Sequence, residues 1–432
     1  MRYEPADSTL FMHNRSRLSA MLKPSSIGIL DSNDLMPTNA DGTLPWRQNS
    51  DLYYLSGIDQ EESTLLLFPD AADPSDREIL FIKETSEHIA IWEGQKLSKQ
   101  KATELSGIGN VQWNCQFDKV LERLTEQASH IYLNANEHPR ANITVQTRDV
   151  RLLKKCQQDY PDHQYERLAP LMHQLRVIKH SAEINMIQKA CNITEAGFRR
   201  VLNFIKPGVG EWEIEAEFIH EFIKQQSTGF AYTPIIASGK SSCILHYIKN
   251  NQRCQDGELL LMDVAAEYAN WNSDMTRTIP VNGQFTQRQR AVYDAVLRVL
   301  RKCNDILRPG ITPDDYQKET IDFVEHELIT LGLIDEDEAK QQDASKPLVK
   351  KYFMHSTSHH LGLDVHDVCP ADEPYAVGMV LTIEPGIYIP DEKIGIRLEN
   401  NILIRETDNL DLMADIPIEA DEIEALMAKS IQ

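Results

Sequence analysis

The sequence predicts an α/β domain followed by an α+β domain, in a chain of 432 residues. Three observations lead to this prediction. The chain is too long for a single hydrophobic core. Helical and strand-like patterns alternate over roughly the first 170 residues, and the remainder combines a few long helices with short strands. We place the boundary so that the domains are 1–175 and 176–432.

The elements expected in the first domain alternate between helix and strand. In chain order they are a helix over 9–21, strands over 27–30, 64–68 and 79–82, a helix over 117–128, a strand over 130–133 and a helix over 147–158. Such an alternation is typical of a sheet covered by helices.

Three helices and several strands are expected in the second domain. Ser181 can cap a long helix that keeps its apolar residues at helical spacing. Thr286 and Gln289 form a capping-box pair ahead of a second helix, and Pro313 begins a third. Strands are expected over 235–237, 244–247, 259–264, 275–280, 380–384 and 396–404. This combination favours helices on one face of a largely antiparallel sheet.

Composition disfavours several classes of protein. The formal net charge of −22 argues against nucleic acid or an anionic membrane as partner, because both require a basic surface. An apolar run long enough to span a membrane is not found, and the N-terminal segment lacks the apolar region of a secretory signal. The seven cysteines are scattered without a CxxC pair, which indicates reduced thiols in a cytoplasmic protein.

Four carboxylates and one imidazole in the second domain indicate a pair of bound cations. They are Asp263, Asp274, His359, Glu384 and Glu399. Three of the four acids lie in apolar, strand-like runs, where an unpaired charge would cost on the order of several kcal/mol. Two adjacent divalent cations would compensate these charges, and one carboxylate could bridge them.

Local patterns bring several of these side chains to common faces. A turn signal at 256–257 precedes a strand that ends at Asp263, and a hairpin of suitable length would return the chain through Asp274. Arg397 and Glu399 are two residues apart in an apolar strand, so we expect them to share a face. The proposed ligands can therefore meet on one side of a sheet.

Each of these residues alone has an ordinary explanation. A single Asp at a strand end more often forms a turn, and Glu399 could be an edge residue or a salt-bridge partner. His359 could be a surface or core histidine. His355 and His359 are four residues apart, but no Glu directly follows His355, so they do not form the HExxH zinc motif. His246 could equally be a core histidine bonded to backbone. The metal prediction therefore rests on the five ligands occurring together.

The same segments carry a resemblance to a known family. The chain resembles the aminopeptidase P and prolidase group of pita-bread metallopeptidases in SCILHY, LLLMDVAAEY, SDMTRTIPVNG, MHSTSHHLGLDVHDV, GMVLTIEPGIYI and GIRLENN. Residues 45–59, PWRQNSDLYYLSGID, resemble the signature of the aminopeptidase P N-terminal domain. The resemblance covers almost the whole chain. It implies a creatinase/aminopeptidase P-like first domain and a pita-bread catalytic domain with a curved, largely antiparallel sheet.

The resemblance also implies a role for each site residue. The four acids and His359 would ligate two divalent ions, manganese in the first place, with cobalt or zinc as alternatives. The substrate site would be lined by His246, His355, His366 and Arg397. His246 or His366 would hold the oxyanion, and Glu384 would carry a proton to the leaving nitrogen. Departures from many relatives at Ser356, Thr357 and His360 leave the shape of the pocket open.

The implied reaction is release of the first residue from a peptide with proline second, by a hydroxide bridging two metals. The alternative is a prolidase, which cleaves dipeptides only, and a more remote one is an inactive binding module on the same scaffold. Peptides are the expected partners, with no nucleic acid and no membrane, and the resemblance implies a homodimer or homotetramer.

Overall fold

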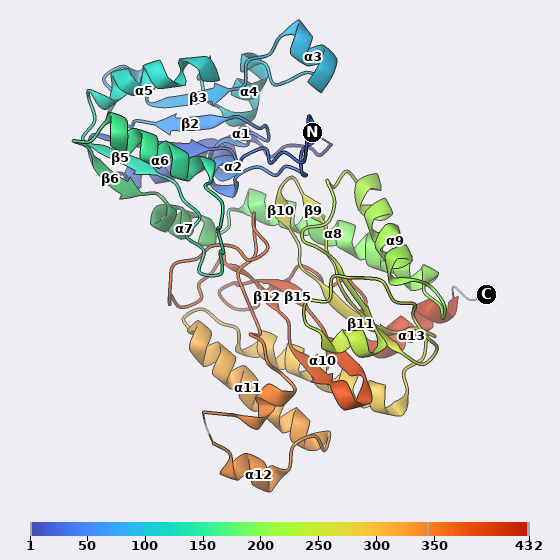
Figure 1. The fold of residues 1–432 in the computed structure, drawn as a ribbon. Helices are drawn as coiled ribbons and strands as arrows, with labels where there is room; N and C mark the ends of the chain where they lie inside the picture. The colour runs from blue at the N-terminus through green and yellow to red at the C-terminus, as the bar shows by residue number, and fades with distance from the viewer. Residues whose placement is uncertain (1, 344, 430–432) are drawn as a thin grey trace. The chain divides into compact units, whose positions relative to one another are not determined.

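The structure, a computed structural model, describes residues 2–343 and 345–429, which form two compact units (Figure 1). The first unit comprises Tyr3–Arg176 with Val368–Pro370, and the second comprises Val177–Asp367 and the chain from Ala371. Among the described residues, no helix combines the length and apolar character that crossing a membrane requires. All seven cysteines lie within the described residues, and none of them is joined in a disulfide.

The first unit is built on a six-stranded mixed sheet with strand order β4-β3-β2-β1-β5-β6. Its strands are β1 (Ser26–Asp31), β2 (Thr64–Leu67), β3 (Glu78–Ile82), β4 (Asn110–Trp113), β5 (His130–Leu133) and β6 (Gln164–Arg167). The pairs β1–β2 and β2–β3 are antiparallel and the others are parallel. The expected strands over 27–30, 64–68, 79–82 and 130–133 are confirmed.

Helices cover this sheet as the alternating pattern predicted. They are α1 (Ser8–Met21), α2 (Ser50–Ser56), α3 (Glu87–Glu93), α4 (Lys99–Ser106), α5 (Phe117–Thr125), α6 (Arg148–Asp159) and α7 (Ala169–Val177). Leu121 and Leu124 of α5 and Cys156 of α6 pack with Ile27 and Ile29 of β1 in one buried core. The helices α5 and α6 therefore share one face of the sheet.

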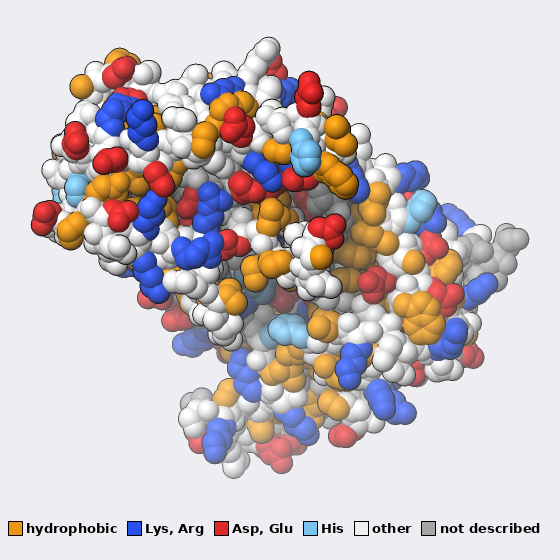
Figure 2. Space-filling view, turned by 45° about the horizontal axis from the view of Figure 1, so that its top comes forward, with side chains coloured by type: hydrophobic (Ala, Val, Ile, Leu, Met, Phe, Trp, Pro, Cys, Tyr) orange, Lys and Arg blue, Asp and Glu red, His pale blue; other side chains and the backbone are white. Residues whose placement is uncertain are grey.

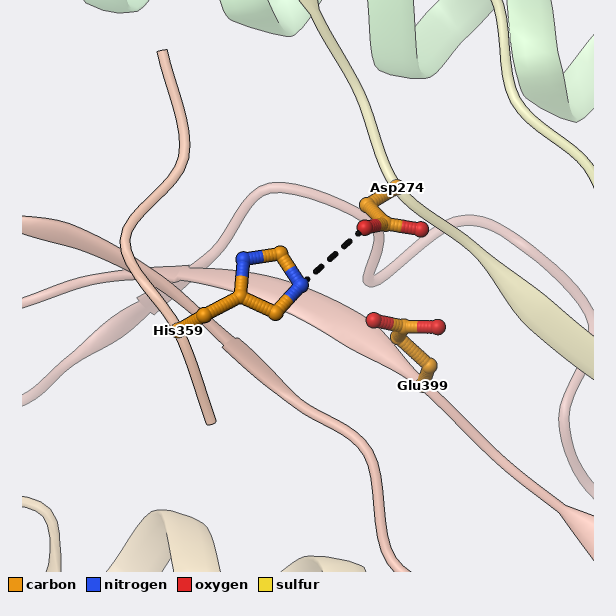
Figure 3. A group of neighbouring side chains, drawn as sticks. All are labelled: Asp274, His359 and Glu399. Atoms are coloured by element: carbon orange, nitrogen blue, oxygen red, sulfur yellow. Dashed lines mark ion pairs between the residues drawn. The ribbon is translucent and has the colours of Figure 1, made fainter. Parts of the chain in front are cut away.

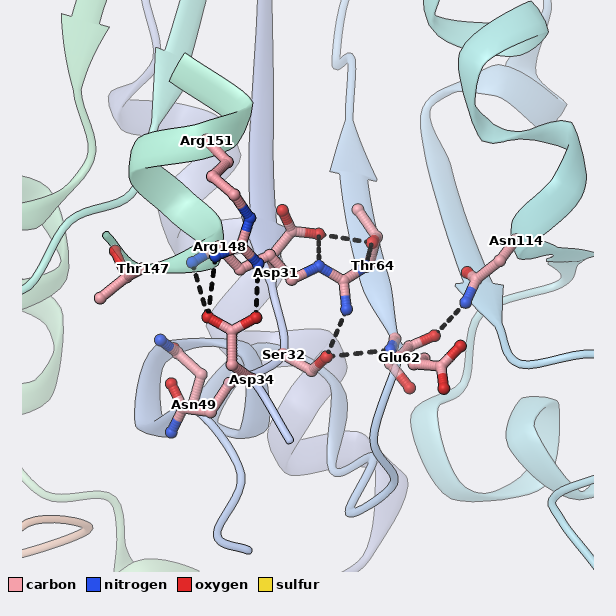
Figure 4. Close-up of polar contacts among 12 residues, drawn as sticks. Asp31, Ser32, Asp34, Asn49, Glu62, Thr64, Asn114, Thr147, Arg148 and Arg151 are labelled. Atoms are coloured by element: carbon pink, nitrogen blue, oxygen red, sulfur yellow. Dashed lines mark hydrogen bonds and ion pairs between the residues drawn. The ribbon is translucent and has the colours of Figure 1, made fainter. Parts of the chain in front are cut away.

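A polar network anchors α6 at the carboxyl end of β1 (Figure 4). The Thr64 hydroxyl donates to Oδ1 of buried Asp31 at 2.5 Å. Nη1 of Arg148 donates to the Ser32 hydroxyl at 2.9 Å, and the Arg148 backbone N–H donates to Oδ2 of Asp34, also at 2.9 Å. Nη2 of Arg148 also donates to the Thr64 hydroxyl at 3.2 Å, so the first turn of α6 is tied to β2 and to the end of β1.

The second unit is α+β. Its helices are α8 (Ser181–Phe204), α9 (Glu211–Lys224), α10 (Gln287–Ile306), α11 (Pro313–Thr330), α12 (Glu336–Gln341) and α13 (Ala420–Lys429). Its strands are β7 (Ile235–Ser238), β8 (Leu259–Asp263), β9 (Glu267–Tyr268), β10 (Trp271–Asn272), β11 (Thr276–Pro280), β12 (Val380–Ile383), β13 (Gly386–Ile389), β14 (Ile394–Arg397), β15 (Asn400–Leu403) and β16 (Leu410–Asp411). Short 3₁₀ helices in the two units cover Pro74–Asp76, Asn114–Gln116, Gly239–Cys243, Leu348–Lys351 and Pro390–Glu392.

The strand pairs of the second unit are all antiparallel, as predicted. The sheets have the orders β11-β8-β7 and β12-β15-β16, with the hairpins β9-β10 and β13-β14 beside them. On the face shown in Figure 2, Lys and Arg side chains are interspersed with Asp and Glu.

The helix starts follow the predicted signals with one correction. The capping box of Thr286 and Gln289 is present at α10, and Pro313 is the first residue of α11. Ser181, however, is not the cap of α8 but its first residue. The cap is His180, whose ring accepts from Ala182 N–H and whose backbone N–H donates to the Glu183 carboxylate.

The strand predicted over 244–247 was wrong. The chain over Gly239–Cys243 forms a 3₁₀ turn, and Ile244 is 54% exposed. The Ser242 hydroxyl donates to Gly239 O at 2.6 Å and accepts from Gly395 N–H at 2.9 Å. The Ile244 N–H then donates to Ser241 O at 2.9 Å, so the chain turns where the strand was expected to begin.

The single strand predicted over 396–404 was also wrong, because it is two strands. Leu398 and Glu399 separate β14 from β15. The Glu399 N–H donates to Thr276 O on β11 at 3.0 Å, and the Leu398 N–H donates to Pro385 O at 3.2 Å. Neither N–H group therefore takes part in the pairing of β14 or β15. The break between these strands contains Glu399, a proposed metal ligand.

Candidate metal centre

The ends of short strands bring the five predicted ligands into one region of the second unit. Asp263 ends β8, Asp274 lies between β10 and β11, and His359 precedes β12. Glu384 follows β12, and Glu399 occupies the break between β14 and β15. Each residue lies where the ladder stops, so its side chain is free to face its neighbours.

Three of these residues form a compact group (Figure 3). One ligand atom from each of Asp274, His359 and Glu399 lies within 4.8 Å of the others. Nε2 of His359 is 3.3 Å from Oδ2 of Asp274 and 3.7 Å from Oε1 of Glu384. Glu384 therefore adjoins the group through His359.

Asp263 joins the site through Arg397 and not through the compact group. Its Oδ2 accepts from Nη2 of Arg397 at 2.7 Å. Its Oδ1 is buried and has no hydrogen-bond partner. A buried carboxylate oxygen without a donor is the kind of group that a cation would satisfy.

Burial and mutual repulsion perturb the titration of these groups. Burial raises the pKa of Asp263 even though Arg397 opposes the shift. Burial raises the pKa of Glu384 to about 7, and burial together with Asp274 holds the pKa of Glu399 well above its usual range. Burial opposes charge on His359, but Asp274 and Glu384 outweigh it and raise the pKa of the imidazole to about 9.

The donor set fits divalent cations. Nδ1 of His359 lies 2.9 Å from His360 O, so it donates there and leaves Nε2 facing the acids. Carboxylate oxygens with one imidazole suit hard or borderline ions such as manganese or zinc. Cations would also relieve the repulsion among acids that burial forces together.

A second set of polar residues forms a wall beside the acids. Nε2 of His355 lies 2.8 Å from the Tyr388 hydroxyl, which accepts from Nη1 of Arg397 at 2.9 Å. Nε of Arg397 donates to the Thr276 hydroxyl, which donates to Oε2 of Glu399 at 2.7 Å. Burial and the nearby Arg397 lower the pKa of His355 to about 4, so its ring is neutral near pH 7.

The other two predicted histidines lie at the edge of this region. The ring of His366 packs edge-to-face on that of His359, with 4.4 Å between centroids. His246 is exposed, in the turn that follows the 3₁₀ helix, and is close enough to influence the charge on His355. Its exposure excludes the alternative of a core histidine.

Some residues of the site were missed in the sequence. Thr276 pairs with Asp263 in the register of β11 and β8, and Tyr388 lies in the hairpin β13-β14. Tyr232 is close enough to Asp263 to counteract part of the rise in the pKa of that carboxyl. The hairpin register could have identified Thr276, because a strand that leaves Asp274 places it opposite Asp263. Nothing local marks the two tyrosines.

Comparison with known proteins agrees with this geometry. The chain matches metallopeptidase family M24 over residues 185–406 and the aminopeptidase P N-terminal domain over residues 11–132. It is 34% identical to the Xaa-Pro aminopeptidase of Escherichia coli strain K12, over 96% of this chain and 97% of the relative. It is 30% identical to Homo sapiens Xaa-Pro aminopeptidase 3, over 89% of this chain and 77% of the relative.

Solved structures with the same fold extend over nearly the whole chain. The low-pH form of E. coli aminopeptidase P has a TM-score of 0.90 at 30% identity and covers 99% of this chain and 100% of its own. Zn-substituted E. coli aminopeptidase P in complex with product has a TM-score of 0.88 at 30% identity, with 99% of each chain covered. The similarity includes both units.

Proposed function

Because the chain belongs to metallopeptidase family M24 and is a metallo-exopeptidase, we propose that it releases the first residue from peptides with proline in second position. The observation that carries this proposal is the convergence of Asp274, His359 and Glu399, with Glu384 beside His359. The names of the relatives support the Xaa-Pro specificity.

We assign two divalent cations to Asp263, Asp274, His359, Glu384 and Glu399. The support is a set of four buried or half-buried acids and one imidazole, with one oxygen of Asp263 unsatisfied. Manganese is the first choice for these mostly oxygen ligands, and zinc or cobalt are the alternatives. When bound, the cations supply a nucleophile at neutral pH by lowering the pKa of a shared water.

The surrounding side chains divide the remaining work. Glu384, beside His359, can take a proton from the water and deliver it to the departing nitrogen. His246 and His366 are the proposed donors to the oxyanion, and one such donor is worth about 3 kcal/mol. The neutral ring of His355, together with Tyr388 and the charged Arg397, forms the wall against which the proline ring would pack.

This arrangement suits an Xaa-Pro bond for a simple reason. The proline nitrogen carries no hydrogen and its ring fixes φ, so a site that grips the substrate through that N–H would fail. The wall of His355, Tyr388 and Arg397 needs no such bond, because it offers ring faces and a guanidinium plane. Recognition by shape can therefore replace the missing donor.

A peptide panel tests the proposal. The purified protein is loaded with Mn²⁺, its bound metal is counted, and hydrolysis of Xaa-Pro-Xaa, Xaa-Pro and Xaa-Ala-Xaa peptides is compared. We expect cleavage of Xaa-Pro-Xaa, with Glu384→Gln as the inactive control. Cleavage of Xaa-Pro dipeptides alone would make the protein a prolidase. Absence of both metal and hydrolysis after reconstitution would indicate an inactive binding module.

A further inference from the structure

We infer that Lys179 is a positioning residue for the reaction, which holds His366 in place through a buried ion pair with Asp367. The inference rests on the proposed function, since His366 needs positioning only if the site is catalytic. Lys179 lies just before α8, and its backbone N–H donates to Gly378 O at 2.9 Å. Its backbone is therefore fixed independently of its side chain.

The ion pair is almost completely removed from solvent. Nζ of Lys179 lies 3.0 Å from Oδ2 of Asp367, and the two side chains are 1% and 2% exposed. Nζ also donates to Val177 O at 3.4 Å. The desolvation of such a pair can exceed its Coulombic gain, so stability alone is a weak reason for its presence. Its place in the fold offers a better reason.

The loop 359–367 carries the proposed ligand His359 and the proposed oxyanion donor His366, and its first limb, residues 359–361, is tied to β12. The His359 N–H donates to the Thr382 hydroxyl at 3.1 Å, and the Thr382 N–H donates to His359 O at 2.9 Å. The Leu361 N–H donates to Val380 O at 3.0 Å. His359 is therefore held by the sheet itself.

The tip at Gly362 and the return limb that ends at Asp367 are held by Asn272, by Lys179 and by a bond back to the first limb. Gly362 O accepts from both the backbone N–H and Nδ2 of Asn272, at 2.9 and 3.0 Å. On the return limb, the Asp367 N–H donates to His360 O at 2.9 Å while its carboxylate meets Lys179. Loss of Lys179 would remove the cation 3.0 Å from that buried carboxylate, and the limb would shift to relieve the cost of burying the charge.

Such a shift acts on His366 before it acts on the metal ligands. His366 directly precedes Asp367, and its ring packs on His359 at 4.4 Å between centroids. A displacement of about 1 Å at a reacting group can lower a rate about 100-fold. We therefore expect a loss of kcat with the bound metal retained.

Gly362 provides a way to disturb the pair without removing a charge. A Cβ on this residue would lie 2.3 Å from Oδ2 of Asp367 and 3.1 Å from Cε of Lys179. Its backbone is not among those with positive φ, so alanine meets no conformational strain there. The effect of Gly362→Ala is therefore steric and falls on the Asp367 carboxylate.

The experiment compares four variants of the full chain. Lys179→Met and Gly362→Ala disturb the pair, Lys179→Arg restores a cation, and Arg15→Met removes another buried cation, 1% exposed and paired with Glu78 in the first unit. We measure kcat, KM, bound Mn²⁺ and Tm, and amide hydrogen exchange in 359–367 and in β11. Assays run below the lowest Tm.

We expect Lys179→Met and Gly362→Ala to lower kcat roughly 10- to 100-fold at unchanged KM and metal content. Lys179→Arg should recover part of the rate, and Arg15→Met should lower Tm alone. Unchanged kcat in both of the first two variants, or loss of metal in step with loss of rate, would overturn the inference. If the wild type cleaves no Xaa-Pro peptide, the proposed function fails. Hydrogen exchange then decides separately whether the Lys179–Asp367 pair anchors the loop 359–367. Faster exchange at the Asp367 amide in both variants, with β11 unchanged, supports the anchor, and equal exchange rejects it.

Discussion

Nη2 of Arg397 lies 2.7 Å from Oδ2 of Asp263, so one proposed metal ligand is already paired with a protein cation. The same guanidinium donates to Tyr388 and Thr276. Arg397 therefore links the acid cluster to the wall beside it. A residue placed in this way affects both the charge and the shape of the site.

Replacing Arg397 should destabilise the protein even without substrate. In Arg397→Gln the Asp263 carboxylate stays buried without its cation, and breaking such a pair costs about 3–5 kcal/mol. Arg397→Lys should rescue little, because a single ammonium cannot reach Tyr388, Thr276 and Asp263 together. Urea unfolding of the metal-free proteins measures the loss. Full stability of the Lys variant would show that the forked geometry is unimportant.

Asp274→Asn should abolish activity with only a modest loss of fold. The substitution keeps the shape of the side chain but removes a charge 3.3 Å from Nε2 of His359. Bound metal, counted by mass spectrometry, should fall together with turnover, while the circular dichroism spectrum stays that of the wild type. Wild-type rates in a metal-depleted Asp274→Asn protein would disprove the ligand assignment.

His246→Ala should separate binding of metal from catalysis. His246 is exposed and neighbours His355, so it can reach the substrate without contacting the compact ligand group. We expect both ions to stay bound and kcat to fall by about 100-fold, as for the loss of one oxyanion donor. The measurement is metal content beside steady-state kinetics. A collapse in metal content would make His246 a ligand.

The metal-free protein should lose stability as the pH rises from about 5 to about 9. The pKa of Glu384 rises from 4.5 to about 7 on folding, and that of His359 from 6.5 to about 9. In both cases the folded state holds the proton more tightly than the unfolded chain. This stabilisation is fully present below the unfolded values and is lost as the pH passes the folded ones.

Bound metal should reverse this trend, because the ligands bind as a charged carboxylate and a neutral imidazole. The rise in Tm that Mn²⁺ produces should therefore grow with pH over the same range. Thermal melts with and without the ion measure both curves. A metal-free Tm that climbs with pH would contradict the titration assigned to Glu384 and His359.

Much of the fold follows from local signals in the sequence. The capping box of Thr286 and Gln289 and the strand that ends at Asp263 are both set by residues next to one another in the chain. The prediction failed at 244–247, where Tyr247 is buried in a core cluster although the segment is a turn and not a strand. Ile244 at its start is 54% exposed, and Ile248 just after it is 57% exposed. An apolar turn with one buried tyrosine cannot be distinguished from a strand by pattern alone.

The site was predictable by residue type but not by geometry. The acids and His359 could be selected because charges in apolar runs need compensation. The break at Glu399 depends on a hydrogen bond to Thr276, far away in the chain, and so does the position of Arg397. Contacts between distant segments are decided by strand register and packing, which no local window contains.

The crowding of acids at this centre also sets a limit on how robust the chain can be. Burial and Asp274 both penalise a charged Glu399. Glu399→Gln should therefore stabilise the metal-free fold by removing that repulsion. An engineer who wanted a sturdier, inert carrier would begin with that exchange. With Glu399 in place, the stability of the folded chain should depend on the concentration of metal ion around it.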